Sequence, residues 1–307
     1  ASASVFEDTT FTGTLDGTIS TSVDNGITLT LDQAKVTGKT VTGAGDITIT
    51  AVDASTNLTN VNPSGGVTAN LNDGVNISAN SQLGNIDNIT FTSGADATLS
   101  IAQQNKITAG DGSNTITLSE AGTVIGSSFI EIYNLFNASG NDFTAAATGQ
   151  TVVGTASVDI IRGGDGADTI TGGDGLDALT GGGGGDRFVF DSTDAFTNVD
   201  SSSVYETISD FTTASDTLYF GAAVDAYSEV SGHEFVASSF DTRANAFFDD
   251  TVSGRDVYVE YNLSGLGDAL LAVDMDQNNS LGSGDILIKM LGVDSASDII
   301  STDIVNS

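Results

Sequence analysis

The sequence contains no cysteine and no tryptophan, and it has a single proline and a single histidine. Without cysteine the chain forms neither disulfides nor thiolate metal sites. One histidine, His233, excludes a zinc site built from several histidines, and the pair His233-Glu234 is not followed by a second histidine at zinc-protease spacing. We interpret His233 as a surface or cap residue.

Basic residues are also scarce. Eight Lys and Arg stand against 41 Asp and Glu, which gives a formal charge of −33. Such a charge excludes nucleic acid as a natural partner and disfavours an anionic membrane surface. No stretch approaches the ~18 consecutive apolar residues of a membrane-spanning helix, so we expect no membrane insertion. The first residues show no secretory signal pattern.

Catalytic motifs are missing as well. The sequence has no nucleophile elbow of the type G-x-S-x-G and no phosphate-binding loop. Carboxylate pairs carry little information, because some pair among 41 acids will always be available for glycosidase-like chemistry. The sequence therefore predicts no catalytic residues and no enzyme. A polysaccharide-active enzyme that uses a carboxylate pair along a groove stays open as an alternative.

Residues 154–189 form four nine-residue repeats in tandem: GTASVDIIR, GGDGADTIT, GGDGLDALT and GGGGGDRFV. They share the pattern Gly-Gly-x-Gly-x-Asp-x-apolar-x, which predicts a six-residue turn followed by a three-residue strand. The sixth position holds Asp159, Asp168, Asp177 and Asp186, and the eighth holds Ile161, Ile170, Leu179 and Phe188. Two repeats make one coil, so Asp159 should stack on Asp177 and Asp168 on Asp186.

Carboxylates and backbone carbonyls at this spacing suit a hard cation that takes six to eight oxygen ligands, which indicates calcium. The first repeat lacks glycine at its second and fourth positions, so we do not expect full coordination by Asp159. The alternative, a glycine-rich flexible linker, needs neither the aspartates nor the apolar positions. The predicted calcium ligands are Asp159, Gly163, Gly164, Asp165, Gly166, Asp168, Gly172, Gly173, Asp174, Gly175, Asp177, Gly182, Gly184 and Asp186.

These repeats resemble the calcium-binding nonapeptides of the RTX proteins. The resemblance implies that Ca²⁺ ions sit between stacked turns and couple folding to calcium. It also implies type I secretion from a Gram-negative cell on a C-terminal signal. Without the ion, we expect the turns to be disordered.

The N-terminal half predicts short strands from Thr/Val/Ile alternation, at residues 27–31, 47–50, 89–92 and 115–118. Residues 86–94 are similar to 130–140, and residues 109–117 match the nonapeptide loosely, 45 residues before Gly154. We therefore expect a stacked unit of about 45 residues. Asn114 replaces the acid there, which disfavours a calcium site. The segments at 86–94 and 130–140 share the pattern Ile-(Asp/Glu)-x-x-(Asn/Thr)-apolar and close on Ser-Gly. This pattern resembles the rungs of β-solenoid surface-layer proteins of Gram-negative bacteria, over roughly residues 40–190. An ordinary β-sandwich is the alternative.

The segments that follow the repeats are Phe188-Val189-Phe190, Ile208-Ser209-Asp210-Phe211 and Asp216-Thr217-Leu218-Tyr219-Phe220. Their order resembles the C-terminal module of type I-secreted RTX proteins, which would cap the last coil. Residues 257–261, 269–273 and 286–290 predict antiparallel strands, and residues 298–305 a part of the secretion signal. The loop Asp274–Asp285 imitates an EF-hand, but Asn279 replaces the glycine and Asp285 the glutamate. We interpret it as a polar hairpin loop; any ion there would be a further calcium.

The sequence thus predicts an all-β fold: a parallel β-solenoid or β-roll with Thr/Asn-rich rungs and an antiparallel C-terminal cap. We expect an assembly region at residues 1–125, a calcium-binding solenoid at 126–190, and a capping and secretion module at 191–307. The function we expect is that of a secreted, self-assembling subunit of a surface layer, sheath or filament. Its partners would be other copies of the chain and cell-surface polysaccharide. The alternative is the C-terminal portion of a larger adhesin or exoenzyme.

Overall fold

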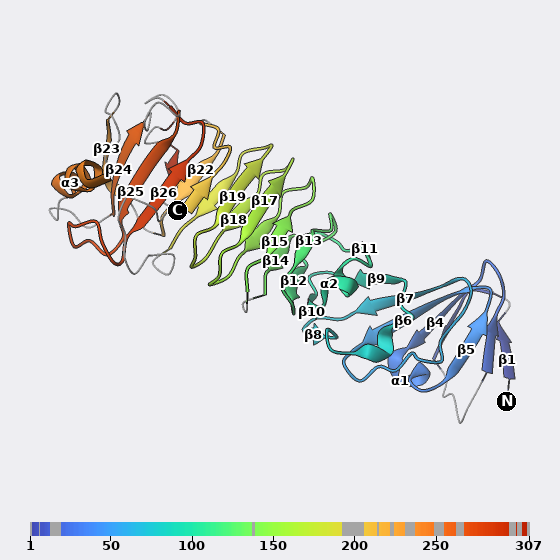
Figure 1. The fold of residues 1–307 in the computed structure, drawn as a ribbon. Helices are drawn as coiled ribbons and strands as arrows, with labels where there is room; N and C mark the ends of the chain where they lie inside the picture. The colour runs from blue at the N-terminus through green and yellow to red at the C-terminus, as the bar shows by residue number, and fades with distance from the viewer. Residues whose placement is uncertain are drawn as a thin grey trace. The chain divides into compact units, whose positions relative to one another are not determined.

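The chain folds into two compact units, which are described separately: unit 1 comprises Ala1–Glu120 and Ser127–Asn134, and unit 2 comprises Ala121–Gly126 and Leu135–Ser307. Both are built almost entirely from β-strands (Figure 1). The computed structural model describes residues 2–5, 7–12, 20–136, 139–191, 206–213, 215–221, 224–230, 237–248, 255–261, 267–294, 299 and 303–305. His233 lies outside these residues.

Unit 1 consists of parallel strands stacked in three sheets, with the orders β1-β3-β5, β11-β9-β7-β6-β4-β2 and β8-β10-β12-β14. Short helices join some of the strands: α1 (Gln33–Val36), η1 (Ser81–Leu83) and α2 (Ile101–Gln104). The strands are β1 (Ser2–Val5), β2 (Thr9–Phe11), β3 (Ser20–Val23), β4 (Thr28–Asp32), β5 (Thr40–Gly43), β6 (Asp46–Val52), β7 (Gly66–Leu71), β8 (Val75–Asn76), β9 (Asn88–Phe91), β10 (Asp96–Leu99), β11 (Ile107–Ala109), β12 (Thr115–Leu118) and β14 (Ile132–Asn134).

Each coil of unit 1 takes about twenty residues. Asp46 pairs with Gly66, twenty residues later, and Thr115 pairs with Ile132, seventeen residues later. The predicted unit of about 45 residues is therefore wrong. Residues 86–94 contain β9 and residues 130–140 contain β14, and these strands belong to different sheets. Their similarity reflects the shared alternation of apolar and polar residues rather than equivalent places in a repeat.

In unit 2, parallel strands continue in the sheet β16-β18-β20-β22-β27 and in the sheet β13-β15-β17-β19-β21-β26-β25-β24-β23. Figure 1 shows these strands side by side. The elements are β13 (Thr123–Ile125), β15 (Asp142–Thr144), β16 (Thr151–Val153), β17 (Ile160–Gly164), β18 (Thr169–Thr171), β19 (Ala178–Gly182), β20 (Arg187–Val189), β21 (Glu206–Ile208), β22 (Thr217–Tyr219), β23 (Val224–Val230), α3 (Ala237–Phe247), β24 (Arg255–Tyr261), β25 (Ala269–Asp274), β26 (Ile286–Met290) and β27 (Ile304–Val305).

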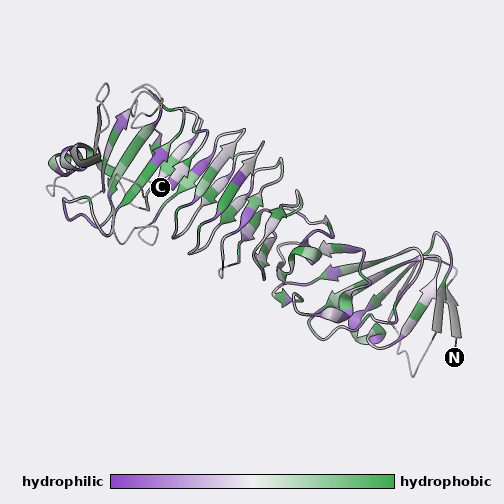
Figure 2. Ribbon diagram, viewed as in Figure 1, coloured by the Kyte–Doolittle hydropathy of each residue, from purple (hydrophilic) through white to green (hydrophobic). Residues whose placement is uncertain are grey.

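The core of the repeat region is a column of single apolar residues. The eighth-position side chains Ile161, Ile170, Leu179 and Phe188 are all fully buried. Ile170 and Phe188 lie at the centres of the three-residue strands β18 and β20, and Ile161 and Leu179 are the second residues of the five-residue strands β17 and β19. Figure 2 shows both hydrophobic (green) and hydrophilic (purple) residues along the strands of this region. Register repeats every eighteen residues, because Thr151 pairs with Thr169 and Thr169 with Arg187. The predicted parallel solenoid of two repeats per coil is confirmed.

The C-terminal part of unit 2 is a mixed sheet. The three predicted strands correspond to β24, β25 and β26, and they pair antiparallel as expected. However, β23 pairs parallel with β24, and β26 pairs parallel with β21, which joins this sheet to the solenoid. Helix α3, whose Phe240 and Ala244 pack on Tyr258, was not predicted from the sequence. Of the predicted secretion segment, Ile304 and Val305 form β27, paired with β22.

Candidate calcium sites

Buried polar side chains run along both sides of the repeat region, at the beginning of its strands. Asn141, Asp159 and Asp177 directly precede strands of one sheet, Glu206 is the first residue of β21 in the same sheet, and these four form the first column. Gln150, Asp168, Asp186 and Asp216 precede strands of the other sheet and form the second column. Consecutive members lie one coil apart. The four sixth-position aspartates are thus brought together in two pairs, Asp159 with Asp177 and Asp168 with Asp186, as predicted.

Hydrogen bonds run along each column in one direction. The backbone N–H of Asp159 donates to Oδ1 of Asp177 at 2.7 Å, and that of Asp177 donates to Glu206 Oε2 at 2.7 Å. In the second column, Asp168 N–H donates to Asp186 Oδ1 at 2.9 Å, and Asp186 N–H donates to Asp216 Oδ1 at 3.0 Å. Each carboxylate therefore uses one oxygen to fix the register of the preceding coil. The second oxygen of each carboxylate is left to accept another hydrogen bond or to bind an ion.

In several turns, this second oxygen accepts a hydrogen bond from the residue four positions earlier. Oδ2 of Asp168 accepts the Gly164 N–H at 2.8 Å, and Oδ2 of Asp159 accepts the Thr155 N–H at 2.8 Å. The turn before Asp186 differs. Gly182 has φ +95°, a conformation that favours glycine, and Oδ2 of Asp186 has no hydrogen-bond partner although it is buried. Gly173, in the turn before Asp177, shares this conformation with φ +92°.

The first glycine of a repeat leaves space where oxygens converge. A Cβ on Gly163 would lie 1.9 Å from the carbonyl oxygen of Gly181, one coil later, and 2.7 Å from Oδ2 of Asp168. At Gly154 the same position is 2.1 Å from the Gly172 carbonyl oxygen and 3.1 Å from Asp159 Oδ2. Carbonyl and carboxylate oxygens from successive turns are the ligands that calcium takes in proteins. The residues present therefore fit calcium.

The electrostatics of the columns favour a cation. Burial raises the pKa of Asp168, and it raises the pKa of Asp186 to about 6, with the charges of Asp216, Asp168 and Asp210 adding to the effect. Neither Asp168 nor Asp186 forms an ion pair with Lys or Arg in the described part of the chain. Burying an uncompensated carboxylate is costly, so a divalent cation between the turns would stabilise the ionised form.

Comparison with known families agrees with this geometry. Residues 153–188 match the family model of the RTX calcium-binding nonapeptide repeat, in four copies. This part of the chain therefore consists of RTX-type calcium-binding repeats. No curated protein matches it significantly. RTX repeats bind calcium, so Ca²⁺ is the ion that the columns hold when the site is loaded.

Not every predicted ligand reaches the columns. The four sixth-position aspartates are buried, with exposed fractions of at most 2%. The third-position residues Asp165 and Asp174 are exposed on the turns. The fourth-position glycines stack, since a Cβ on Gly184 would lie 2.5 Å from the carbonyl oxygen of Gly166. The ligand role of each predicted residue stays a prediction. The predicted glycines lie in the turns at 163–166, 172–175 and 182–184.

Sequence reasoning missed five polar residues of the site. Asn141 and Gln150 precede the first RTX repeat in the columns, while Glu206 and Asp216 extend them beyond the last repeat. Asp210 accepts hydrogen bonds from Gly181 and Gly182. A signal was present, because every column residue except Glu206 directly precedes a strand that contains a buried apolar residue. The eighteen-residue register does not predict the last column residues, since Asp177 and Glu206 are 29 residues apart.

Outside the columns, the loop between β25 and β26 brings three acids together. Carboxylate oxygens of Asp274, Asp276 and Asp285 lie within 4.8 Å of one another, and Asp274 and Asp285 are buried. The loop closes with its own hydrogen bonds: Asp285 accepts the Met275 N–H at 2.9 Å and the Gly282 N–H at 2.8 Å. The interpretation as a polar hairpin loop is consistent with the antiparallel pairing of β25 and β26.

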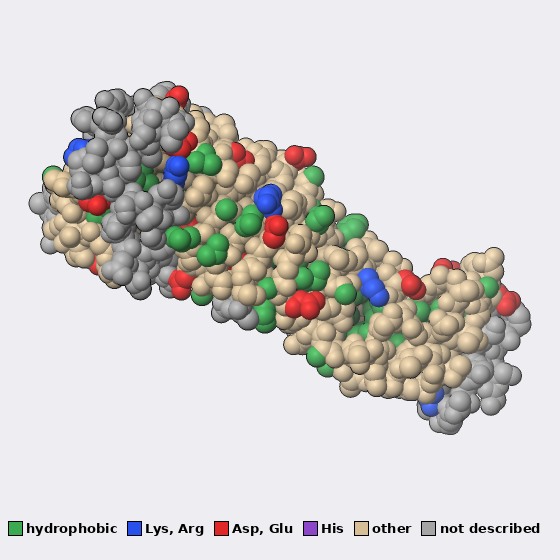
Figure 3. Space-filling view, in the orientation of Figure 1, with side chains coloured by type: hydrophobic (Ala, Val, Ile, Leu, Met, Phe, Trp, Pro, Cys, Tyr) green, Lys and Arg blue, Asp and Glu red, His purple; other side chains and the backbone are tan. Residues whose placement is uncertain are grey.

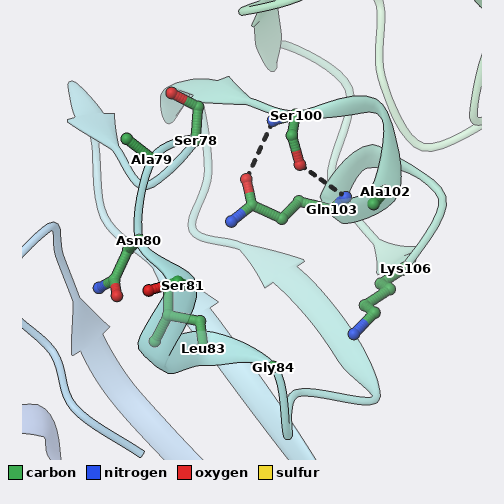
Figure 4. A pocket seen from close by; sticks show the side chains of 10 residues that line it. All are labelled: Ser78, Ala79, Asn80, Ser81, Leu83, Gly84, Ser100, Ala102, Gln103 and Lys106. Atoms are coloured by element: carbon green, nitrogen blue, oxygen red, sulfur yellow. Dashed lines mark hydrogen bonds between the residues drawn. The ribbon is translucent and has the colours of Figure 1, made fainter.

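Unit 1 contains a cavity of about 300 Å³ between η1 and α2, lined by both polar and apolar groups (Figure 4). The Ser100 hydroxyl accepts the Gln103 N–H at 3.3 Å, while the Gln103 side-chain oxygen accepts the Ser100 N–H at 2.9 Å. Lys106 Nζ donates to the carbonyl of Ile86 at 2.5 Å. The lining residues are Ser78, Ala79, Asn80, Ser81, Leu83, Gly84, Ser100, Ala102, Gln103 and Lys106.

Proposed function

We propose that this RTX protein is a secreted, calcium-dependent structural protein, a subunit of a surface layer, sheath or extracellular filament of a Gram-negative bacterium. The observation that carries the proposal is the pair of buried acid columns. Without a divalent cation they bury several like-charged carboxylates inside a stack of turns. Calcium is abundant outside cells, so the RTX repeats would fold after export. None of the helices in the described residues is long and apolar enough to cross a membrane.

Self-association is supported by the ends of the sheets. The sheet β11-β9-β7-β6-β4-β2 ends at β2, and the sheet β1-β3-β5 ends at β1. A terminal strand offers backbone N–H and C=O groups to the edge of another sheet. A head-to-tail contact of this kind does not close, so it generates a fibre or lattice instead of a dimer.

Charge explains why calcium would also control assembly. At −33, copies of the chain repel one another at close contact, even with a screening length of about 8 Å. On the face in Figure 3, acidic side chains are scattered among neutral ones, and Lys and Arg are few. A divalent cation lowers this repulsion and orders the repeats at the same time.

The test is light scattering and negative-stain imaging of the whole chain with calcium, with magnesium at the same concentration, and with a chelator. We expect ordered assemblies with calcium only, because magnesium matches the ionic strength but demands a small octahedral site. A chain lacking its first twenty residues should remain monomeric with calcium. A whole chain that stays monomeric in calcium would favour the portion of a larger adhesin or exoenzyme instead.

Cell-surface polysaccharide is the further partner that we propose, and we assign no enzyme activity. The cavity lined by Ser81, Ser100 and Gln103 supports this partner, because hydroxyl and amide groups match the hydrogen-bonding groups of a sugar. Sedimentation with polysaccharide from the host cell surface tests it. Binding should weaken for Ser81→Leu, and the exposed substitution Asn72→Asp, outside the cavity, should leave it unchanged.

A further inference from the structure

The cavity between η1 and α2 contains a single charged side chain. Lys106 lines it, and none of the other lining residues in Figure 4 is an Asp or Glu, although the chain carries 41 acids. In Figure 4 the Lys106 side chain extends from the segment after α2 towards the space between α2 and η1. The cavity is therefore positively charged in a strongly acidic chain.

The ammonium group of Lys106 keeps hydrogen-bonding capacity for a ligand. Its Nζ donates to the carbonyl oxygen of Ile86 at 2.5 Å, which uses one of the three N–H groups of an ammonium. The ion pairs among the described residues involve Arg162, Arg243 and Lys289, and not Lys106. A partly buried cation without a carboxylate partner favours an anionic ligand, because the anion forms charge-assisted hydrogen bonds with it.

The other lining groups suit a sugar ring, which combines hydroxyl groups with apolar C–H faces. The Ser100 hydroxyl accepts the Gln103 N–H at 3.3 Å and keeps its own O–H to donate. Leu83 and Ala102 add apolar surface to the lining. A volume of about 300 Å³ lies at the lower end of ligand pockets, so the cavity has room for one ring and not for a long segment of polymer.

We propose that this cavity binds a sugar that carries a carboxylate, such as a uronic acid residue of an acidic polysaccharide, with the carboxylate at Lys106. The proposal rests on the proposed polysaccharide partner and narrows it to acidic polymers. The chain as a whole repels anions, but a screening length of about 8 Å confines that repulsion to nearby charges. Since no acid lines the cavity, the attraction by Lys106 prevails there.

The test compares D-glucuronate, the methyl ester of D-glucuronic acid and D-glucose, which share a ring but differ in charge. Titrations of the whole chain, followed by saturation-transfer difference NMR, give a dissociation constant for each sugar. Glucuronate should bind about tenfold tighter than either neutral sugar, which corresponds to about 1.4 kcal/mol, and added NaCl should reduce the difference. Equal dissociation constants for glucuronate and its methyl ester, or no binding of glucuronate, overturn the proposal.

Variants assign the preference to one side chain. Lys106→Met removes the charge and should abolish the preference for glucuronate, whereas Lys106→Arg should keep it. The matched control is Lys35→Met, because Lys35 also lies in unit 1 and also donates to a carbonyl oxygen, that of Thr12 at 2.7 Å, but does not line the cavity. A preference that Lys106→Met keeps, or that Lys35→Met loses, contradicts the proposal. If Lys106→Met does not fold, the comparison of glucuronate with its methyl ester on the unmodified chain decides.

The acidic-sugar site and the polysaccharide partner can fail separately. Sedimentation with polysaccharide from the host cell surface is repeated for the unmodified chain and for Lys106→Met. If the polysaccharide sediments equally with both, the partner stands and the acidic-sugar site is overturned. If it sediments with neither while glucuronate still binds through Lys106, the partner is wrong and the acidic-sugar site stands.

Discussion

The backbone N–H of Asp159 donates a hydrogen bond to the carboxylate of Asp177, eighteen residues later, at 2.7 Å. Asp168 and Asp186 have the same relationship at 2.9 Å. The acids that define the RTX repeats therefore hold successive coils in register through one oxygen. We predict that the same side chains also bind calcium, in which case coil stacking and calcium binding are coupled.

Amides replace carboxylates in the turns of unit 1. Asn114 is fully buried, and its Nδ2 donates to the carbonyl oxygens of Thr92 at 3.1 Å and Ala95 at 3.0 Å. Asn85 Nδ2 likewise donates to the carbonyls of Leu58 at 3.1 Å and Val61 at 3.0 Å. An amide N–H₂ group thus satisfies carbonyls that a cation would otherwise coordinate. The buried acids identified in the described residues begin only at Asp159.

Removal of calcium should therefore loosen unit 2 and leave unit 1 folded. We expect amides of residues 154–189 to lose hydrogen-exchange protection in EGTA, while those of β6 and β7 keep theirs. The measurement is hydrogen exchange of the whole chain by mass spectrometry, with and without the chelator. Equal loss of protection in both units, or in neither, would contradict the assignment of calcium to the repeats.

The first glycine of a repeat should tolerate no side chain. Gly163→Ala places a Cβ 1.9 Å from the Gly181 carbonyl oxygen, so we expect a loss of about 1–3 kcal/mol in stability and weaker calcium binding. Gly183→Ala is the matched control, because the nearest atom to its Cβ would be 3.6 Å away. Chemical denaturation in calcium compares the two variants. Similar losses would show that backbone flexibility, and not oxygen crowding, requires these glycines.

The nine-residue spacing was sufficient to predict the coil, the eighteen-residue register and the stacking of Asp168 on Asp186, because a short period leaves one way to bury one apolar residue per strand. The coil length of unit 1 could not be predicted from the sequence, since paired residues in neighbouring strands lie between seventeen and twenty-two residues apart. The sequence pattern placed Asp210 and Asp216 only in the cap. Their place beside the last repeats depends on the pairing of β21 with β19 and of β22 with β20. The segments that lead to β21 and β22 do not have the length of a nine-residue repeat. Helix α3 was also missed, because it buries only Phe240 and Ala244 in the cap core, with Phe248 directly after its end, and so few apolar residues make a weak signal.

Asn114→Asp should convert a calcium-independent turn into an unstable one. The carbonyls of Thr92 and Ala95 lose a donor and face a negative charge, at about 1–3 kcal/mol for each unsatisfied group. We expect a lower melting temperature in EGTA, partly restored by calcium, which the new carboxylate and the two carbonyls can ligate. Asn72→Asp, an exposed change in the same unit, is the control for charge. Identical melting of the two variants would show that the amide is not needed.

The cap should lose stability as pH rises towards neutrality in the absence of calcium. Burial raises the pKa of Asp285 to about 7, with the charges of Asp274 and Asp276 contributing, whereas the ordinary value is 3.8. The folded chain thus keeps a proton that the unfolded chain releases, so this stabilisation is complete below pH 3.8 and lost as pH rises through about 7.

Between the two pKa values of Asp285, the free energy of unfolding should fall by about 1.4 kcal/mol for each unit of pH. Guanidinium unfolding followed by tyrosine fluorescence in EGTA, at pH 5 and pH 7, measures it. Asp285→Asn should reduce the difference between the two pH values by the slope of one proton, because an amide does not titrate. The same pH dependence in the variant would assign the titration to another group. Stability that rises from pH 5 to pH 7 only in the unmodified chain would reverse the sign and contradict the raised pKa.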